Sequence, residues 1–504
     1  MPSTRTLADF IGARQRIEDH LPWARVVIDA QSWQVITEQL TASRWVMSGL
    51  WGDTGAVHMA LVEEAAATMA VVTLLCPDGR FPSIGQHHPP AIRLERTIHD
   101  LFGLEPINAP DLRPWLDHDR WGQRHPLGAK AIGVDAKPYT FLPAEGESLH
   151  QIAVGPVHAG IIEPGHFRFN VNGEAIVRLE SRLGYAHKGV ESLMMGANLE
   201  HAAKLAGRVS GDSTVAYAIA FARAVEAALG TEVPARAHWL RALMAELERL
   251  ANHLGDIGAI CNDASFSIIQ AHCAVLREKV LRTADSCFGH RLMRDCVVPG
   301  GVALRRDIVD ATVLRALLAE IRHRFPALIE LYDNTASLQD RTVSTGILRP
   351  DLAQQFGAGG YVGRASGRGF DARRALPYPP YDQLAFEVPI LQEGDVNARV
   401  WIRIREVEQS LALIEQILVD LPGGAMRAEL PRRAGEGLAM VEGFRGDILI
   451  WVRLDGEARI ARCHLRDPSW FQWPLLEAVV EGNIVADFPL CNKSFNCSYS
   501  GCDL

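Results

Sequence analysis

The sequence predicts an α+β protein, in which an N-terminal α/β domain precedes a large, mainly helical domain with a small β-hairpin region. Three observations support this class. Residues 69–76 are apolar and partly β-branched, as in a strand, and a turn-forming Pro-Asp-Gly follows them. Residues 166–180 alternate between apolar and polar side chains around Asn172-Gly173, the strongest short hairpin signal. Residues 234–258 repeat leucine or isoleucine at every third or fourth position, as on one face of a helix.

The first domain is expected to cover residues 1–120 and to mix short helices with strands. Residues 61–70 predict a helix. Residues 93–101 predict a short amphipathic helix that ends at Gly103. Residues 121–150 are rich in glycine, proline and charge, and we expect them to form a linker to the second domain.

The second domain is expected to cover residues 151–504. After the hairpin and the leucine-rich helix, further helices are predicted at 307–336 and 396–420. A long irregular stretch rich in Gly, Pro and Arg separates them, and its length favours a functional loop over an ordinary connection. The tail at 440–504 is predicted to hold strands and turns.

Composition excludes several classes of protein. The 504 residues carry a net charge of −9 without a long basic run, which argues against nucleic acid as a partner because phosphate binding needs clustered Lys and Arg. The first residues have no apolar core of signal-peptide length, and no apolar segment is long and uncharged enough to span a bilayer. Nine cysteines without a regular framework fit free thiols in a reducing compartment. We therefore expect a cytoplasmic protein.

Three cysteines gather near the end of the chain, at Cys491, Cys497 and Cys502. Zinc sites usually use Cys-x-x-Cys or close variants, and these cysteines are spaced more widely. Cys491 lies in an apolar stretch and is expected to be a small buried residue. The spacing alone therefore does not predict a metal site.

Ordered motifs give the chain a resemblance to known families. RLERTIHDLFGLEPINAPDLRPWL is similar to the signature of the C-type subunit of bacterial complex I. The matching residues are Glu95, Asp100, Phe102, Gly103, Pro110, Asp111, Leu112 and Arg113. Downstream blocks resemble the D-type subunit of complex I and the catalytic subunit of membrane-bound nickel–iron hydrogenases; they include GPVHAGIIEPGHFRFNVNGEAIVRLESRLGYAHKGVESLM, RALMAELERLANHLGDIG, DRTVSTG, GRASGRGFDARRALPYPPYD and IVADFPLCNKSFN. The fused C–D order, with Glu163-Pro164, resembles the large subunit of formate-hydrogenlyase-type hydrogenases.

This family holds nickel and iron with four cysteine thiolates in two Cys-x-x-Cys pairs. The resemblance places Ser210 and Ser213 at the first pair, and Ser498 and Gly501 at the second. Soft metals prefer thiolate ligands, and a serine hydroxyl does not ionise near neutral pH. We therefore predict that this chain binds no nickel–iron centre and that the four ligand positions are vacated.

The D-type subunit of complex I also lacks these thiolates, and there the cavity resembles a quinone headgroup pocket. His158 matches the histidine of the Gly-Pro-x-His motif in that family. A second histidine and a tyrosine of the family are replaced here by Ile162 and Gly211. Reduction of a quinone carbonyl needs a positioned hydrogen-bond donor, and both of these donors are missing. The chain therefore carries neither the thiolates of the nickel–iron site nor the complete set of quinone-binding groups. A quinone remains the candidate ligand.

The resemblance also nominates individual residues. Glu163 matches the hydrogenase glutamate that passes protons from the metal, and the alternative is a structural carboxylate paired locally with Arg208. Arg364 and Asp371 lie in the irregular loop, where either cavity-lining roles or a structural ion-pair network would account for them. The candidate catalytic residues are Glu163, His158, Arg208 and Asp212. The candidate cofactor-binding residues are His158, Ser210, Gly211, Ser213, Arg364 and Asp371.

The resemblance implies a redox-complex subunit that lies on the inner face of the cell membrane through its partners. These would be an iron–sulfur small subunit similar to the B-type subunit of complex I, a ferredoxin-like subunit and antiporter-like membrane subunits. The chain would pass electrons to a quinone or another small acceptor and couple this to proton movement. The alternative is a catalytically silent subunit that holds the iron–sulfur subunit on the membrane arm. An open cavity around the vacated positions would favour the first hypothesis, and a filled one the second.

Overall fold

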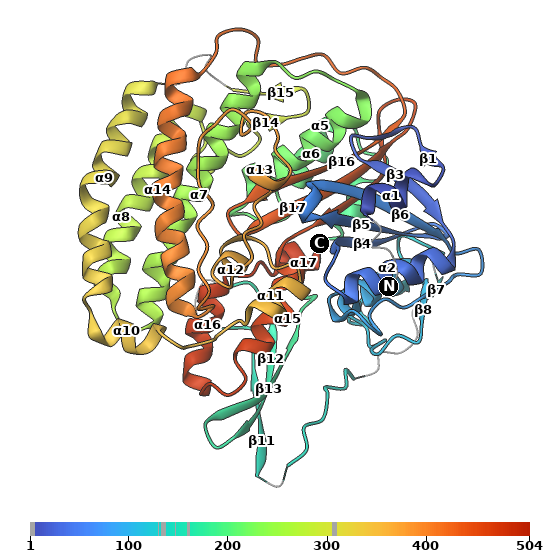
Figure 1. Cartoon of the computed structure of the whole chain (residues 1–504), viewed down its shortest axis with the longest axis horizontal. Coiled ribbons are helices and arrows are strands. Elements are labelled where there is room, and N and C mark those ends of the chain that lie inside the picture. The colour runs from blue at the N-terminus through green and yellow to red at the C-terminus, as the bar shows by residue number, and fades with distance from the viewer. Residues whose placement is uncertain (1–5, 130, 133–137, 147, 159–161, 305–309) are drawn as a thin grey trace.

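The computed structural model describes residues 6–129, 131–132, 138–146, 148–158, 162–304 and 310–504. Two β-sheets lie face to face, and a layer of long helices flanks the second one (Figure 1). The architecture is the expected α+β class, with the α/β domain first and the mainly helical domain after it.

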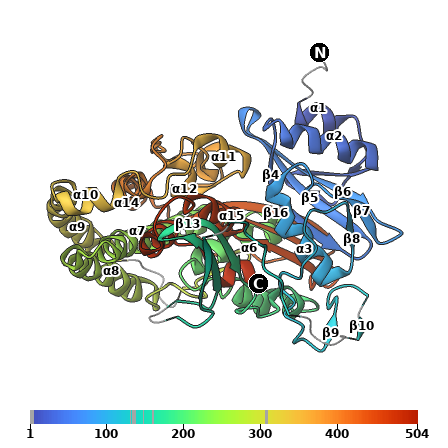
Figure 2. The same cartoon turned by 90° about the horizontal axis from the view of Figure 1, so that it is seen from below.

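A five-stranded sheet in the order β1-β3-β6-β5-β4 forms the first domain. Strands β3 and β6 run parallel and the other neighbours run antiparallel. The elements are α1 (Leu7–Gly12), β1 (Arg16–Ile17), β3 (Ala24–Ile28), α2 (Ala30–Thr41), β4 (Val46–Asp53), β5 (Ala56–Glu63), β6 (Thr68–Leu75), β7 (Arg80–Pro82), α3 (Ile92–Phe102), β8 (Glu105–Ile107), β9 (Gln123–Arg124) and β10 (Ala131–Ile132). Helices α1 and α2 lie over one face of this sheet (Figure 2).

The helix predicted at residues 61–70 is wrong, because this stretch contains the end of β5, a short 3-10 turn and the start of β6. Both strands are buried along nearly their whole length. Met59 and Leu61 belong to the main core, whereas Ala60 and Val62 pack against the second domain. A strand covered on both faces is apolar throughout, so it lacks the alternation that would have distinguished it from a helix.

Helix α3 confirms the short amphipathic helix predicted before Gly103, which adopts a left-handed φ of 73°. Glu95 of this helix is fully buried. One of its carboxylate oxygens accepts hydrogen bonds from the backbone N–H groups of Ile84 and Gly85, and the other accepts one from the hydroxyl of Ser83. Burial raises the pKa of Glu95 to about 7, although these hydrogen bonds act to lower it.

We expect Glu95→Gln to remove a pH dependence of stability. A glutamate that titrates near pH 7 when folded and near 4.3 when unfolded stabilises the folded protein at low pH, and this contribution is lost as the pH rises through 7. Glutamine keeps the backbone hydrogen bonds but does not titrate. Urea unfolding between pH 5 and 7 should therefore show a slope that differs from the wild type by up to about 1.4 kcal/mol per pH unit. Parallel profiles for the two proteins would contradict this.

The second domain begins with the antiparallel sheet β11-β12-β13, made of β11 (Leu149–Val154), β12 (His166–Asn172) and β13 (Ala175–Arg182). Strands β12 and β13 form the hairpin predicted around Asn172-Gly173, and Asn172 pairs with Ala175 across the turn. Gly173 has a φ of 61°, a conformation that glycine adopts readily.

Four long helices form the flanking layer (Figure 1): α7 (Ala235–Asp263), α8 (Ser267–Phe288), α9 (Ala311–Asp333) and α14 (Val396–Asp420). The leucine face predicted in 234–258 is confirmed in α7, where Leu240, Leu247 and Leu254 have no exposed surface. The charged side chains between these leucines, such as Glu246 and Arg249, are buried as well. The helices expected at 307–336 and 396–420 correspond to α9 and α14, although residues 307–309 lie outside the described residues. None of the helices in the described ranges has an apolar stretch long enough to cross a bilayer.

Shorter elements lie between these sheets and helices in the chain. They are α4 (Val190–Met194), α5 (Leu199–Ala206), α6 (Thr214–Leu229), β14 (Val297–Val298), β15 (Gly301–Val302), α10 (Ala336–Thr342), α11 (Pro350–Gln355), α12 (Gly360–Arg364) and α13 (Ala372–Ala375).

The tail is half strand and half helix. β16 (Gly435–Gly443), β17 (Gly446–Leu454) and β18 (Ile460–Arg466) are followed by α15 (Ser469–Val479), α16 (Phe488–Phe495) and α17 (Ser500–Asp503). The prediction of strands is therefore wrong beyond residue 468. Helix α15 is mainly apolar and most of its residues are buried, so its sequence carries little helical periodicity.

The two domains share a sheet. Strand β2 (His20–Leu21) of the first domain runs parallel to β16 and completes the order β18-β17-β16-β2. Across the domain boundary, Trp51 and Met69 pack in one apolar cluster with Leu438 and Trp451. Domain packing therefore buries the second face of the first sheet.

Candidate functional site

Two of the serines that the resemblance places at metal-ligand positions, Ser210 and Ser498, face each other. Ser210 follows α5, and Ser498 precedes α17, almost three hundred residues later in the chain. Their hydroxyl oxygens lie 2.8 Å apart, and the backbone N–H of Gly501 donates to the Ser498 hydroxyl at 3.0 Å. Ser213, at the start of α6, lies 3.5 Å from the Asp212 carboxylate through its hydroxyl. The fold thus brings together the two stretches that the family resemblance had paired.

A cavity of about 530 Å³ opens beside these serines. Six of the nominated residues line it: His158, Glu163, Ser210, Gly211, Asp212 and Ser498. Ile162 and Gly211, which replace the family's histidine and tyrosine, line it as well, together with Arg445, Asn492, Lys493 and Cys497. The structure does not bring Arg208, Ser213, Arg364, Asp371 or Gly501 to this cavity.

Arg208 lies on the surface, away from Glu163. Its guanidinium forms a two-pronged ion pair with Asp295, at 2.7 and 2.8 Å. This pair is exposed on both sides. The local pairing of Arg208 with Glu163 that the sequence suggested is therefore absent from the described residues, and Arg208 serves another part of the surface.

The central charge pair of the cavity joins Asp212 to Arg445. The guanidinium donates to both carboxylate oxygens, at 2.7 and 2.5 Å, and the hydroxyl of Ser210 donates to the same carboxylate at 3.0 Å. Burial alone would raise the pKa of Asp212, but the charge of Arg445 outweighs it and holds the pKa below its usual value. Asp212 is therefore ionised at neutral pH.

Sequence reasoning missed Arg445. It lies in the turn between β16 and β17, in a Gly-Phe-Arg-Gly stretch, and nothing in that local pattern shows that the turn reaches a cavity. An arginine in a glycine-flanked turn between two apolar strands was the one available signal. Its partner Asp212 lies more than two hundred residues earlier in the chain.

Two carboxyl groups, those of Glu163 and Asp503, lie at α17. Glu163 is exposed, and its carboxylate accepts a hydrogen bond from the backbone N–H of Ser500 at 3.0 Å. Asp503 is fully buried, and its two oxygens accept N–H hydrogen bonds from Gly184 and Ala186. Burial, with a further contribution from the nearby charge of Glu163, raises the pKa of Asp503 to about 7. The pair thus consists of one carboxyl open to the cavity and one that titrates near neutral pH.

His158 stands at the other rim. Its Nε2 lies 2.7 Å from the carbonyl oxygen of Gly165, so this nitrogen carries the proton and Nδ1 is left as an acceptor when the ring is neutral. His158 packs beside Phe167 of β12, with ring centroids 5.8 Å apart. The ring therefore presents one nitrogen for a ligand while the other is held by the backbone.

The cysteines do not form a thiolate set. Cys497 lines the cavity, and Cys491 and Cys502 are buried nearby. Burial raises the pKa of Cys491 to about 11 and the pKa values of Cys497 and Cys502 further, so all three thiols are protonated at neutral pH. In the described part of the chain, no group of three or more His, Cys, Asp or Glu side chains is placed to hold a metal ion. This donor set does not fit a nickel–iron centre.

Arg364 and Asp371 belong to a buried ionic network whose members do not line the cavity. The guanidinium of Arg364 lies 2.7 Å from the Glu406 carboxylate, 2.9 Å from that of Glu442 and 3.4 Å from that of Asp371. All four side chains are at most 2 % exposed. Glu406 also accepts a hydrogen bond from His253 of α7 at 2.8 Å.

The same network continues through Asp371. Its carboxylate binds Arg373 in a two-pronged pair at 3.0 and 2.7 Å, and Arg373 reaches Glu246 of α7 at 2.9 Å. The charges thus connect α7, α14, β16 and the irregular loop, with the positive and negative partners alternating. In this structure Arg364 and Asp371 hold the loop to the helical layer.

Family models of known proteins match most of this architecture. Residues 24–133 match the 30 Kd subunit of respiratory-chain NADH dehydrogenase, residues 264–435 and 427–504 match its 49 Kd subunit, and residues 188–255 match nickel-dependent hydrogenase. The chain therefore belongs to the large-subunit family that respiratory-chain NADH dehydrogenases share with nickel-dependent hydrogenases, with the 30 Kd-type and 49 Kd-type parts fused in one polypeptide.

Its relatives place it more closely within that family. It is 33% identical to formate hydrogenlyase subunit 5 of Escherichia coli K12, over 84% of this chain and 77% of that protein. It is also 33% identical to hydrogenase-4 component G of the same organism, over 89% of this chain and 80% of that one. Among solved structures, a chain of the archaeal membrane-bound sulfane sulfur reductase aligns with a TM-score of 0.67 at 27% identity, covering 71% of this chain and 99% of that chain. The resemblance found in the sequence is confirmed.

Proposed function

We propose that this chain is the large subunit of a membrane-associated, hydrogenase-like oxidoreductase that works without a nickel–iron centre. In this proposal an iron–sulfur small subunit delivers electrons to an acceptor in the 530 Å³ cavity, and the acceptor is a quinone or another small molecule. The observation that carries it is the meeting of Ser210 with Ser498 in an open space, because the ligand positions are kept together but hold no thiolate.

Side chains of the cavity support a role in reduction coupled to proton movement. Reduction of a quinone consumes protons, and the cavity holds groups that can donate or pass them. Asp212 with Arg445 supplies a fixed charge pair, and Glu163 with Asp503 leads from the cavity toward a buried carboxyl. His158 offers a ring nitrogen at the rim. The open cavity favours this function over that of a silent scaffold, whose site would be filled by side chains.

Partners are part of the same proposal. The relatives are named as subunits of formate hydrogenlyase, of hydrogenase-4 and of an archaeal respiratory membrane complex. We infer an iron–sulfur subunit similar to the B-type subunit of complex I, a ferredoxin-like subunit and antiporter-like membrane subunits, with the chain bound to the cytoplasmic face of the membrane through them.

Metal analysis of the assembled complex tests the proposal. The complex is purified from its native host, and nickel, iron and extractable quinone are measured per copy of the chain. We expect iron from the neighbouring subunits and nickel far below one atom per chain, because serine and glycine replace the thiolates. A nickel-dependent hydrogenase purified in the same way is the positive control. Nickel close to one atom per chain would overturn the proposal.

A further inference from the structure

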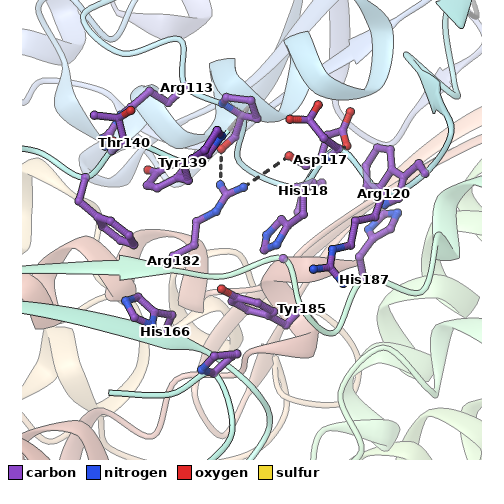
Figure 3. A pocket seen from close by; sticks show the side chains of 18 of the residues that line it. Arg113, Asp117, His118, Arg120, Tyr139, Thr140, His166, Arg182, Tyr185 and His187 are labelled. Carbon is purple, nitrogen blue, oxygen red and sulfur yellow. Dashed lines mark hydrogen bonds between the residues drawn. The ribbon is translucent and has the colours of Figure 1, made fainter. Parts of the chain in front are cut away.

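A second and larger cavity, of about 1040 Å³, is shown in Figure 3. It shares no lining residue with the first. Its walls come from residues 113–124, residues 138–141 and the strands β12 and β13 with the segment that follows them. We call it the arginine cleft, after its five arginines: Arg113, Arg120, Arg124, Arg168 and Arg182.

Charge in the arginine cleft is unbalanced. Among the described residues that line it, two carry a carboxylate, Asp117 and Asp119. Arg124 is paired with Asp119 at 2.6 Å, and Arg113 is paired with Asp111 and Glu180, both at 2.6 Å. The other three arginines have no carboxylate within 4.0 Å in the described ranges of the chain. The cleft therefore carries surplus positive charge.

The burial of Arg182 is unexpected for an arginine side chain. Only 4% of its surface is exposed, and its guanidinium donates hydrogen bonds to the backbone carbonyls of Pro114, Trp115 and Asp117 (Figure 3). It lies 4.2 Å above the ring of Tyr139. The charge of Asp100 acts on Arg182 from beyond ion-pair distance. Burial of a guanidinium without a close counter-charge is costly, and carbonyl dipoles offset only part of that cost. An anion in the cleft would supply the missing charge.

His166 adds a polar group without a complete set of hydrogen bonds on the same wall. It is 8% exposed; its Nδ1 lies 3.1 Å from the Gly155 carbonyl, while its buried Nε2 has no hydrogen-bond partner among the described atoms. Burial lowers the pKa of His166, so the ring is neutral without a ligand. An anion close to Nε2 would favour the protonated ring and receive a hydrogen bond from it. Arg168, over the ring of Phe141 at 4.5 Å, completes this wall.

We propose that the arginine cleft binds a small polyanion that carries phosphate or carboxylate groups, with Arg182, Arg168 and His166 as its main contacts. Guanidinium groups match the planar geometry of these oxyanions and donate two parallel hydrogen bonds to them. The cleft has the volume of a site for a ligand of nucleotide size, and aromatic rings such as Tyr139 and Tyr185 line it. This site does not depend on the function proposed for the first cavity.

Calorimetric titration of the full-length chain tests the site, with ADP as the phosphate probe and citrate as the carboxylate probe in a low-chloride buffer. We expect at least one probe to bind with a one-to-one stoichiometry. Binding of ADP alone identifies a phosphate ligand, binding of citrate alone a carboxylate ligand, and binding of both a site for oxyanions in general.

Two variants test whether the probes bind in the arginine cleft. Arg182→Gln and the partly exposed Arg168→Gln should each weaken binding by about tenfold or more, since each removes a charge-assisted contact. Arg168→Gln keeps the test valid if Arg182→Gln does not fold. Arg322→Gln, which breaks an exposed pair with Glu415 elsewhere, is the matched control and should bind normally.

Three results would overturn the proposal. In the first, neither probe binds at millimolar concentration. In the second, binding is the same in both cleft variants as in the wild type. In the third, no probe binds but both variants prevent assembly with the iron–sulfur subunit, which would make the arginine cleft a protein interface instead.

Discussion

Replacing Arg364 by glutamine is expected to lower the free energy of unfolding by about 3–5 kcal/mol. The substitution leaves Glu406, Glu442 and Asp371 buried near one another without the cation that they share. Asp371 keeps its pair with Arg373 and Glu406 keeps its hydrogen bond from His253, but Glu442 loses its ion-pair partner among the described residues. Removal of one member of a buried ion pair is costly because the charge left behind cannot reach water. Urea unfolding, followed by tryptophan fluorescence, measures the change.

Two further variants make this result interpretable. Arg322→Gln breaks the exposed pair with Glu415 and should cost no more than about 1 kcal/mol, because water screens that pair. Arg364→Lys retains the charge but not the fork of donors, so it should lose less stability than Arg364→Gln. If Arg364→Gln and Arg322→Gln lower the free energy of unfolding by the same amount, the buried network stabilises the protein no more than an exposed ion pair does.

Glu163→Gln is expected to lower turnover of the assembled complex on the order of 10²-fold, with little change in KM. Glutamine can still accept the hydrogen bond from the Ser500 N–H, so the local structure should be kept. It cannot carry a proton, so transfer between the cavity and Asp503 would lose its first group. The rate of quinone reduction by the dithionite-reduced complex, at saturating quinone, is the measurement.

The matched control for this experiment is Glu174→Gln, an exposed glutamate in the β12–β13 turn that lines neither cavity. It should leave turnover unchanged. If Glu163→Gln also reduces quinone at the wild-type rate, Glu163 takes no part in proton transfer and its role is the hydrogen bond to α17.

Local patterns predicted those elements whose apolar and polar side chains are separated in the sequence. The leucine face of α7 is visible because the rest of this largely buried helix carries charged side chains such as Arg241, Glu246 and Arg249. The hairpin at Asn172-Gly173 is visible through its turn. Strand β6 was recognised from its apolar run, but the end of β5 was taken for a helix, since the second domain covers the face that would otherwise be polar. Helix α15 was missed for a similar reason, because most of its residues are buried.

The sequence predicted some residues of the candidate site and missed others. Ser210 and Ser498 were placed by resemblance to a ligand pattern, and the fold brings them within 2.8 Å. Arg445 was not found, because its importance depends on a tertiary contact with Asp212. Arg208 was nominated by the same resemblance, but its side chain points to Asp295 on the surface. A match to a motif did not predict the direction of this side chain.

The strand pair between the domains has a consequence for synthesis of the chain. His20 and Leu21 pair with Glu436 and Gly437, about 400 residues later. The ribosome must therefore have made most of the polypeptide before this edge can close, and until then the apolar face around Trp51 has nothing to cover it. A nascent chain in this state exposes surface that favours aggregation. We expect production of the protein to depend on chaperones that shield the first domain until β16 emerges.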